Sequence, residues 1–178
     1  MTKTCSELFQ GMDCTIIGNG NEEVAGLAFR SDEVHPNDMF FCIVGTVVDG
    51  HSFAQDAIDR GATSLVAERK VYLADATDVT EVVVSDSRKA MAYASANYYD
   101  NPSRAFSLVG ITGTNGKTTT TYLVEHIASV AGNRCGVIGT VGNKIAGVME
   151  HAERTTPESP DLQKLFARMR DAGCTVVA

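Results

Sequence analysis

The sequence predicts an α/β protein with a small N-terminal α/β domain, followed by the start of a second domain built on a parallel sheet. Three observations predict this class. Short apolar stretches alternate with helical patterns along the chain. An Asn101-Pro102 turn interrupts the alternation. Beyond it a strand, a glycine-rich loop and a helix follow in direct order. We therefore expect domains at residues 1–101 and 102–178.

The first block, up to this turn, is predicted to contain three strands and two helices. The strands are apolar runs, and the second helix carries Met91, Ala94 and Tyr98 on one stripe. Gly61 suits the end of the first helix, because glycine readily adopts the left-handed conformation that follows a helix. The expected elements are strands at 38–44, 63–67 and 81–84, and helices at 52–60 and 86–99.

The second block is predicted to begin with a strand, a loop and a helix. The strand covers 106–112, the loop 113–116 and the helix 117–131, which Gly132 ends. A second strand is expected at 134–140.

A further helix is predicted to start at Ser159 and Pro160, with the serine as N-cap and the proline at the first helical position. Its apolar face carries Leu162, Leu165, Phe166 and Met169. Residues 174–178 then form the start of a third strand. Because the strands of a parallel sheet need neighbours, we expect the chain to be the first part of a longer protein.

Composition and charge exclude several classes of protein. The 178 residues are 44% hydrophobic and 21% charged, as in soluble globular proteins. The net charge of −7 and the lack of a Lys/Arg run argue against a nucleic-acid partner. The five cysteines form no CxxC pair, which argues against a disulfide framework or a zinc site. No stretch approaches the ~20 apolar residues of a membrane span. We expect a cytoplasmic protein whose full-length form is a monomer.

The loop between the first strand and helix of the second block has the layout of a phosphate-binding loop. It reads GITGTNGKT from Gly110 to Thr118. Its backbone N–H groups and the helix N-terminus suit an anion, Lys117 can reach β- and γ-phosphates, and the Thr118 hydroxyl can hold Mg²⁺. The usual spacing asks for glycine at 111, whereas this chain has it at 110. A glycine-rich turn that binds nothing is the alternative, but Gly-Lys-Thr between a strand and a helix favours phosphate.

GTNGKTTT after an apolar strand resembles the Mur ligases, which share the GTxGKT/S form of the loop with folylpolyglutamate synthetases. Three further segments are similar to the family: GTVG at 139–142, TTPES at 155–159, and GTVVDGHSF at 45–53, which resembles GxxxDGHxF. The TTPE element favours the family members that add the third residue of the peptide. The resemblance covers nearly the whole chain, from about Leu27 to Ala178.

The resemblance implies that the first domain binds uridine and that the second domain binds ATP through a P-loop. It implies ATP-dependent ligation of diaminopimelate or L-lysine to UDP-N-acetylmuramoyl-L-alanyl-D-glutamate in peptidoglycan synthesis, with ATP and Mg²⁺ as cofactors. Lys117 would be catalytic and Thr118 would hold the metal. Residues implied to bind the cofactor are Gly113, Thr114, Asn115, Gly116, Lys117, Thr118 and Thr119; those implied to bind substrate are Ser31, Gly45, His51, Thr155 and Thr156.

Other interpretations of these residues stay open. The chain could be a non-catalytic module that binds a UDP-sugar, or another P-loop enzyme such as a folate ligase, which the DGHxF and TTPE segments disfavour. We expect the chain by itself not to catalyse ligation. In the family, the rest of the ATP site and the amino-acid-binding domain come later in the sequence. Taken by themselves, His51 marks a turn before a helix, and Thr155 and Thr156 are the polar approach to one.

One segment departs from the family pattern. The family has Asp-Ser-Arg in the uridine pocket, whereas this chain has Arg30-Ser31-Asp32. The exchange leaves room for an ion pair in mirrored form, and we expect Ser31 to be a uridine contact, but Arg30 and Asp32 cannot be given the family's roles. The glycine that follows in the family is Asn37, which tolerates a left-handed turn nearly as well.

Overall fold

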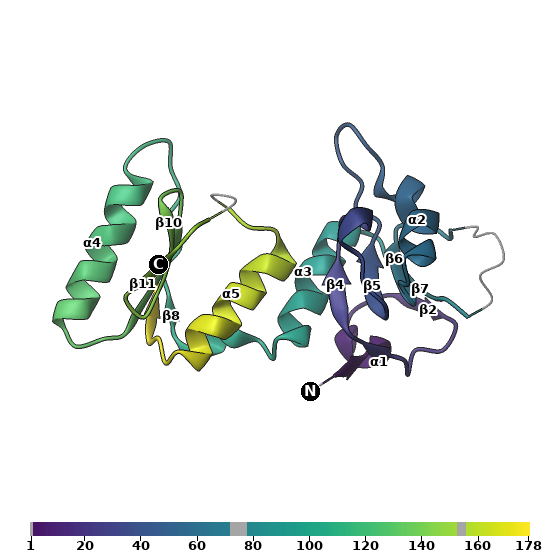
Figure 1. Ribbon diagram of the computed structural model, residues 1–178, viewed down its shortest axis with the longest axis horizontal. Coiled ribbons are helices and arrows are strands. Elements are labelled where there is room, and N and C mark those ends of the chain that lie inside the picture. The colour runs from purple at the N-terminus through teal and green to yellow at the C-terminus, as the bar shows by residue number, and fades with distance from the viewer. Residues whose placement is uncertain (1, 72–77, 153–155) are drawn as a thin grey trace. The chain divides into compact units, whose positions relative to one another are not determined.

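The computed structural model describes residues 2–71, 78–152 and 156–178. The chain forms two compact units, Met1–Tyr98 and Tyr99–Ala178 (Figure 1). The division predicted from the sequence lies three residues later, at the Asn-Pro turn. Each unit is an α/β structure around its own sheet, so the predicted fold class is confirmed.

The first unit is a five-stranded sheet with helices on both faces. The strand order is β2-β7-β6-β5-β4, where β4 to β7 are parallel and β2 is antiparallel to β7. Strands β1 and β3 form a separate antiparallel pair. The elements are β1 (Lys3–Thr4), α1 (Cys5–Leu8), β2 (Thr15–Ile17), β3 (Glu23–Val24), β4 (Gly26–Ala28), η1 (Ser31–Glu33), β5 (Asp38–Phe41), η2 (Gly50–Phe53), α2 (Ala54–Asp59), β6 (Ser64–Ala67), β7 (Thr80–Val83) and α3 (Ser87–Tyr98).

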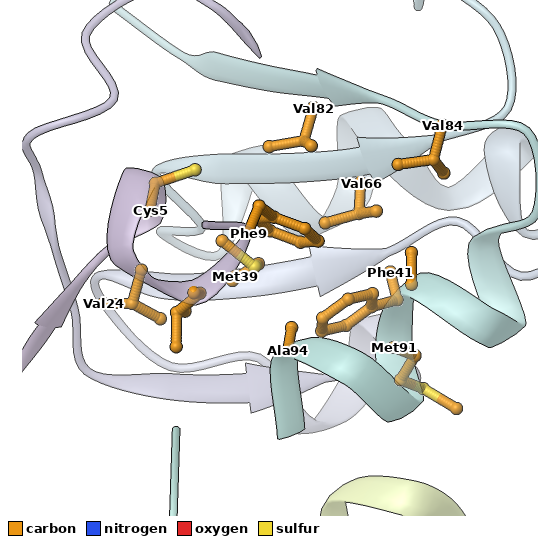
Figure 2. Close-up of a cluster of buried hydrophobic side chains, with 12 residues drawn as sticks. Cys5, Phe9, Val24, Met39, Phe41, Val66, Val82, Val84, Met91 and Ala94 are labelled. Carbon is orange, nitrogen blue, oxygen red and sulfur yellow. The ribbon is translucent and has the colours of Figure 1, made fainter. Parts of the chain in front are cut away.

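Strand β5 shows why this sheet is buried on both sides. All four of its residues are buried, and successive side chains point to opposite faces. Met39 and Phe41 join a core that includes α1 and α3 residues such as Met91 (Figure 2). Phe40, between them, packs in a second core with Ala57 of α2. The sheet therefore lies between α1 and α3 on one face and α2 on the other.

The second unit is a mixed sheet in the order β11-β10-β9-β12-β8. Strands β8, β12 and β9 are parallel, as expected for the start of a parallel sheet, and β10 and β11 extend it antiparallel. The elements are η3 (Pro102–Ala105), β8 (Ser107–Leu108), α4 (Lys117–Val130), β9 (Cys135–Gly139), β10 (Gly142–Ile145), β11 (Val148–Glu150), α5 (Ser159–Asp171) and β12 (Val176–Val177).

Helices α4 and α5 cover opposite faces of this sheet (Figure 1). Two neighbouring residues of β10 contact different helices, because adjacent side chains of a strand point to opposite faces of the sheet. The Lys144 ammonium pairs with the Glu125 carboxylate of α4 at 2.9 Å. Ile145 packs in the core that contains Phe166 and Met169 of α5.

The β10–β11 hairpin was not predicted. Its two-residue turn, Ala146-Gly147, joins Ile145 to Val148, and both turn residues have positive φ, 49° and 94°. Such turns are usually recognised by Asn-Gly or Asp-Gly. Alanine rarely adopts this conformation, so the sequence carries no strong turn signal here.

The predicted start of the helix at Ser159 is wrong by one residue. Glu158 occupies the N-cap position, and Ser159 and Pro160 are the first two helical residues. Proline is tolerated throughout the first turn, because N–H groups there need no intrahelical partner. Its presence therefore locates the helix start only to within a residue.

Several predicted elements are shorter in the structure. Strand β5 ends at Phe41 and not at residue 44, and β8 covers only two residues of the predicted 106–112. Among the described residues, none of the helices has the length and apolar composition that a bilayer crossing requires.

Replacing Phe41 by alanine should lower the free energy of unfolding of the first unit by about 3–5 kcal/mol, because a fully buried ring leaves a cavity that its neighbours fill only in part. Chemical denaturation followed by circular dichroism measures this difference. Phe53→Ala is the matched control, since that ring is 42% exposed and should cost far less. Equal losses in the two variants would contradict the assignment of Phe41 to the core.

Candidate functional site

The glycine-rich loop of the second unit joins β8 to the N-terminus of α4. Gly113 and Gly116 both have positive φ, 147° and 76°, and Gly116 is the N-cap of α4. No atom lies within 4 Å of a Cβ built on Gly116. Glycine is therefore favoured at this N-cap by its torsion angles, and the backbone N–H groups at the helix start stay open to an anion.

The basic side chain of the loop reaches back across it. Lys117 is the first residue of α4, and its Nζ donates a hydrogen bond to the Gly113 carbonyl at 2.6 Å. Thr118 follows in the first helical turn, with an exposed side chain. These groups give the loop one flexible cation and one hydroxyl beside its backbone donors.

A pocket of about 220 Å³ lies beside this loop, at the carboxyl ends of β8, β9 and β12. Open α/β sheets bind ligands at this edge. Three segments singled out in the sequence meet in its lining: Lys117 and Thr118 at the start of α4, Gly139 and Thr140 at the end of β9, and Thr156 before α5.

The other predicted residues of this site lie outside the pocket lining. Gly113, Thr114, Asn115, Gly116 and Thr119 are exposed on the loop and the first turn of α4. Thr155 lies outside the described residues.

The first unit carries a second pocket, of about 260 Å³, beside the carboxyl ends of β4 and β5. Its walls are mainly apolar, with a polar lip. The lip is Arg30, Ser31 and Asp32; the walls are Phe29, Phe40, Ile43, Val48, Gly50 and Phe53. The apolar walls were missed at the sequence level, although Val48, between Gly45 and Gly50, is an available signal.

A mirrored ion pair, which the exchange of Arg30 and Asp32 leaves room for, is present at this lip. The Arg30 guanidinium donates to both Asp32 carboxylate oxygens, from Nε at 3.1 Å and from Nη2 at 2.7 Å. This hydrogen bonding lowers the pKa of Asp32. The left-handed turn expected at Asn37 is also confirmed, with φ of 67°.

Ser31 is the one predicted substrate residue that lines this pocket. Its side chain hydrogen-bonds the Asp56 carboxylate, and this bond, followed by one from Arg60, lowers the pKa of Asp56. Ser31 thus lies near Asp56 of α2 and beside the Arg30–Asp32 pair.

Gly45 and His51 do not line the pocket. The Gly45 N–H donates to the Val48 carbonyl at 3.0 Å, and a Cβ on Gly45 would lie 2.7 Å from that oxygen, so the tight turn requires glycine. The His51 ring is buried, and both of its nitrogens have partners within the protein. Asp49, one of these partners, is a residue that the sequence interpretation passed over as part of a turn.

A third hollow, of about 290 Å³, lies between β10, β11 and the polar side of α5. None of the predicted site residues lines it. Its charged side chains include the Arg168–Glu150 ion pair, which lowers the pKa of Glu150.

Two protein-family models match successive parts of the chain. A model described as "Mur ligase family, catalytic domain" matches residues 23–112, and one described as "Mur ligase middle domain" matches 111–178. A UDP-N-acetylmuramoyl-L-alanyl-D-glutamate--2,6-diaminopimelate ligase of Geobacillus thermodenitrificans is 46% identical over 89% of this chain and 32% of its own length. The protein of that name from Halalkalibacterium halodurans is 42% identical over 98% and 35%. The chain thus spans about a third of these relatives.

Two solved structures share the fold. A structure titled as the same diaminopimelate ligase has a TM-score of 0.77 at 24% identity, covering 99% of this chain and 35% of its own. A MurF ligase from Thermotoga maritima in complex with ADP has a TM-score of 0.52 at 23% identity, covering 85% and 30%. Since one family model alone matches half of the sequence and the second continues it to Ala178, the chain belongs to the Mur ligase family.

Proposed function

We propose that this chain forms the UDP-sugar-binding domain and the first part of the ATP-binding domain of an amide ligase in peptidoglycan synthesis. The ligase joins diaminopimelate or L-lysine to UDP-N-acetylmuramoyl-L-alanyl-D-glutamate. The names of the relatives support the diaminopimelate reaction. The observation that carries the proposal is the pocket at the carboxyl edge of the second sheet, where Lys117, Thr118 and Thr156 meet.

Lys117 is the group best suited to the transferring phosphate. Its present partner is a neutral carbonyl, so the ammonium can turn to phosphate oxygens, which bind it more strongly because they are charged. The backbone N–H groups at the start of α4 hold the same phosphates. Together they stabilise the charge that spreads over the γ-phosphoryl oxygens during transfer.

The residues present also fit a magnesium ion. Thr118 lines the pocket one residue from Lys117, and its hydroxyl would hold the ion, as P-loop threonines do. When bound, Mg²⁺ would neutralise part of the phosphate charge during the transfer.

The proposed ligation proceeds in two steps. A γ-carboxylate oxygen of the D-glutamyl residue attacks the γ-phosphorus of ATP, which gives an acyl phosphate and releases ADP. The incoming amine attacks the acyl carbon, and the tetrahedral intermediate expels phosphate as the nitrogen loses its proton. Thr156 borders the P-loop pocket, so its hydroxyl is suited to orient the acceptor, and we assign Thr155 the same task from the resemblance.

The pocket of the first unit suits the uridine end of the substrate. Its apolar walls, which include Phe29, Phe40 and Phe53, can pack against a flat base. The polar lip, Arg30 to Asp32, supplies donors and acceptors that fix the orientation of the base.

Lys117→Ala should weaken ATP binding by at least about tenfold, because a hydrogen bond to a charged group contributes roughly 1.5–3 kcal/mol. Isothermal titration of the 178-residue chain with Mg-ATP measures the change. Lys164→Ala is the control, since that lysine belongs to the same unit but lines a different hollow. Unchanged affinity in Lys117→Ala, with intact circular dichroism, would refute the loop assignment.

Ser31→Ala should weaken binding of UDP-N-acetylmuramoyl-dipeptide by about two- to tenfold, the range expected for one neutral hydrogen bond. Calorimetric titration checks this, with UDP as a competitor for the same site. Ser85→Ala, an exposed serine of the same unit that does not line the pocket, serves as control. No heat and no thermal shift with the wild-type chain would reject the uridine pocket itself.

A further inference from the structure

The buried ring of His51 has a partner at each nitrogen. Nδ1 lies 2.6 Å from Asp49 Oδ1, and Nε2 lies 3.1 Å from the backbone nitrogen of Glu68. An amide N–H can only donate, so Nε2 must accept. The single proton of the neutral ring is then on Nδ1, from which it is donated to the carboxylate.

Asp49 is the centre of this arrangement. In addition to the ring, its Oδ1 accepts the His51 backbone N–H at 3.0 Å, and its Oδ2 accepts from Arg69 Nη2 at 2.7 Å. The Arg69 bond, followed by the two from His51, holds the pKa of the Asp49 carboxyl well below its usual range. Asp49 is therefore a charged acceptor throughout the neutral pH range.

These contacts close the base of the loop that runs from Ile43 to Gly50. Asp49 forms a β-bridge with Val44, and the Gly50 N–H donates to the Ile43 carbonyl at 2.9 Å. A Cβ on Gly50 would lie 2.5 Å from the Ile43 nitrogen, so the two chain segments touch without room for a side chain. Ile43, Val48 and Gly50 of this loop are walls of the first-unit pocket.

The Glu68 end of the network is anchored to a helix. Its Oε1 accepts hydrogen bonds from the backbone N–H and the hydroxyl of Ser87, at 3.0 and 2.9 Å. Ser87 is the first residue of α3. His51 thereby links the pocket loop to the residue after β6 and, through it, to the start of α3.

We propose that His51 is a positioning residue, which holds the 43–50 loop in the shape that forms the pocket wall and does not itself contact the nucleotide. The identity of the ligand in this proposal is taken from the proposed function. It differs from the assignment that the family resemblance implies, in which His51 binds the substrate directly. At least one ring nitrogen would have to give up its protein partner for that assignment to hold.

Two conservative variants separate the contributions of the two ring nitrogens. In His51→Asn the amide nitrogen can take the place of Nδ1 and keep the bond to Asp49, but nothing reaches the Glu68 N–H. In His51→Gln the longer side chain can accept from Glu68 while the Asp49 contact is lost. His51→Ala removes both contacts, and His35→Asn is the control, since that side chain is 81% exposed.

The first test needs no ligand. ¹⁵N spectra of the 178-residue chain should show His51 neutral with the proton on Nδ1. Amide exchange at Glu68 should accelerate in His51→Asn and at Gly50 in His51→Gln, with no change in His35→Asn. A ring protonated on Nε2, or exchange rates that match the wild type in both variants, would overturn the proposal.

The second test uses UDP affinity, measured by calorimetry, in a double-mutant cycle. His51→Ala and Asp49→Ala should each weaken binding by about five- to tenfold, and the double variant by little more than either, because the two residues act through one loop. Multiplied effects would indicate independent contacts with the ligand and overturn the proposal. If the wild-type chain binds no UDP, the uridine assignment fails, and the ring and exchange results alone decide the positioning role.

Discussion

Burial of the strands on both faces is the constraint on which the rest of the structure depends. In β5 the side chains of Met39, Phe40 and Phe41 enter two different cores, so these positions are filled by apolar groups. The polar groups are displaced to the ends of the strands. In each unit a pocket lies at the carboxyl ends of parallel strands, one beside Lys117 and one beside Ser31. The position of the candidate sites thus follows from the way the cores are filled.

The elements that could be predicted from the sequence are those with a strong local cause. Helix α4 begins at Lys117 as expected, because a strand, two glycines that tolerate positive φ and a helical pattern all agree there. Elements without such a cause were missed. Helix α1 has only four residues, and its capping box, in which Thr4 and Glu7 bond each other's backbone, is too short a signal to separate from a turn.

The candidate sites were predictable in composition but not in detail. Lys117, Thr118, Thr156 and Ser31 line pockets, whereas Gly45 and His51 serve the loop beside one of them. The difference depends on contacts distant in sequence. His51 meets Glu68 seventeen residues further on, and a motif that ends at residue 53 carries no information about that partner.

The Ala146-Gly147 turn has a consequence for how the second unit assembles. A hairpin whose turn holds an alanine in the left-handed region gains little from the turn and is a poor place for folding to begin. Its register must come from outside, from the pairing of β10 with β9 and from the contact of Lys144 with α4. The hairpin should therefore form late, on a template that β9 and α4 have already made. Asn143 and Glu150, which border the hollow next to α5, then reach their positions only after the rest of the sheet is in place.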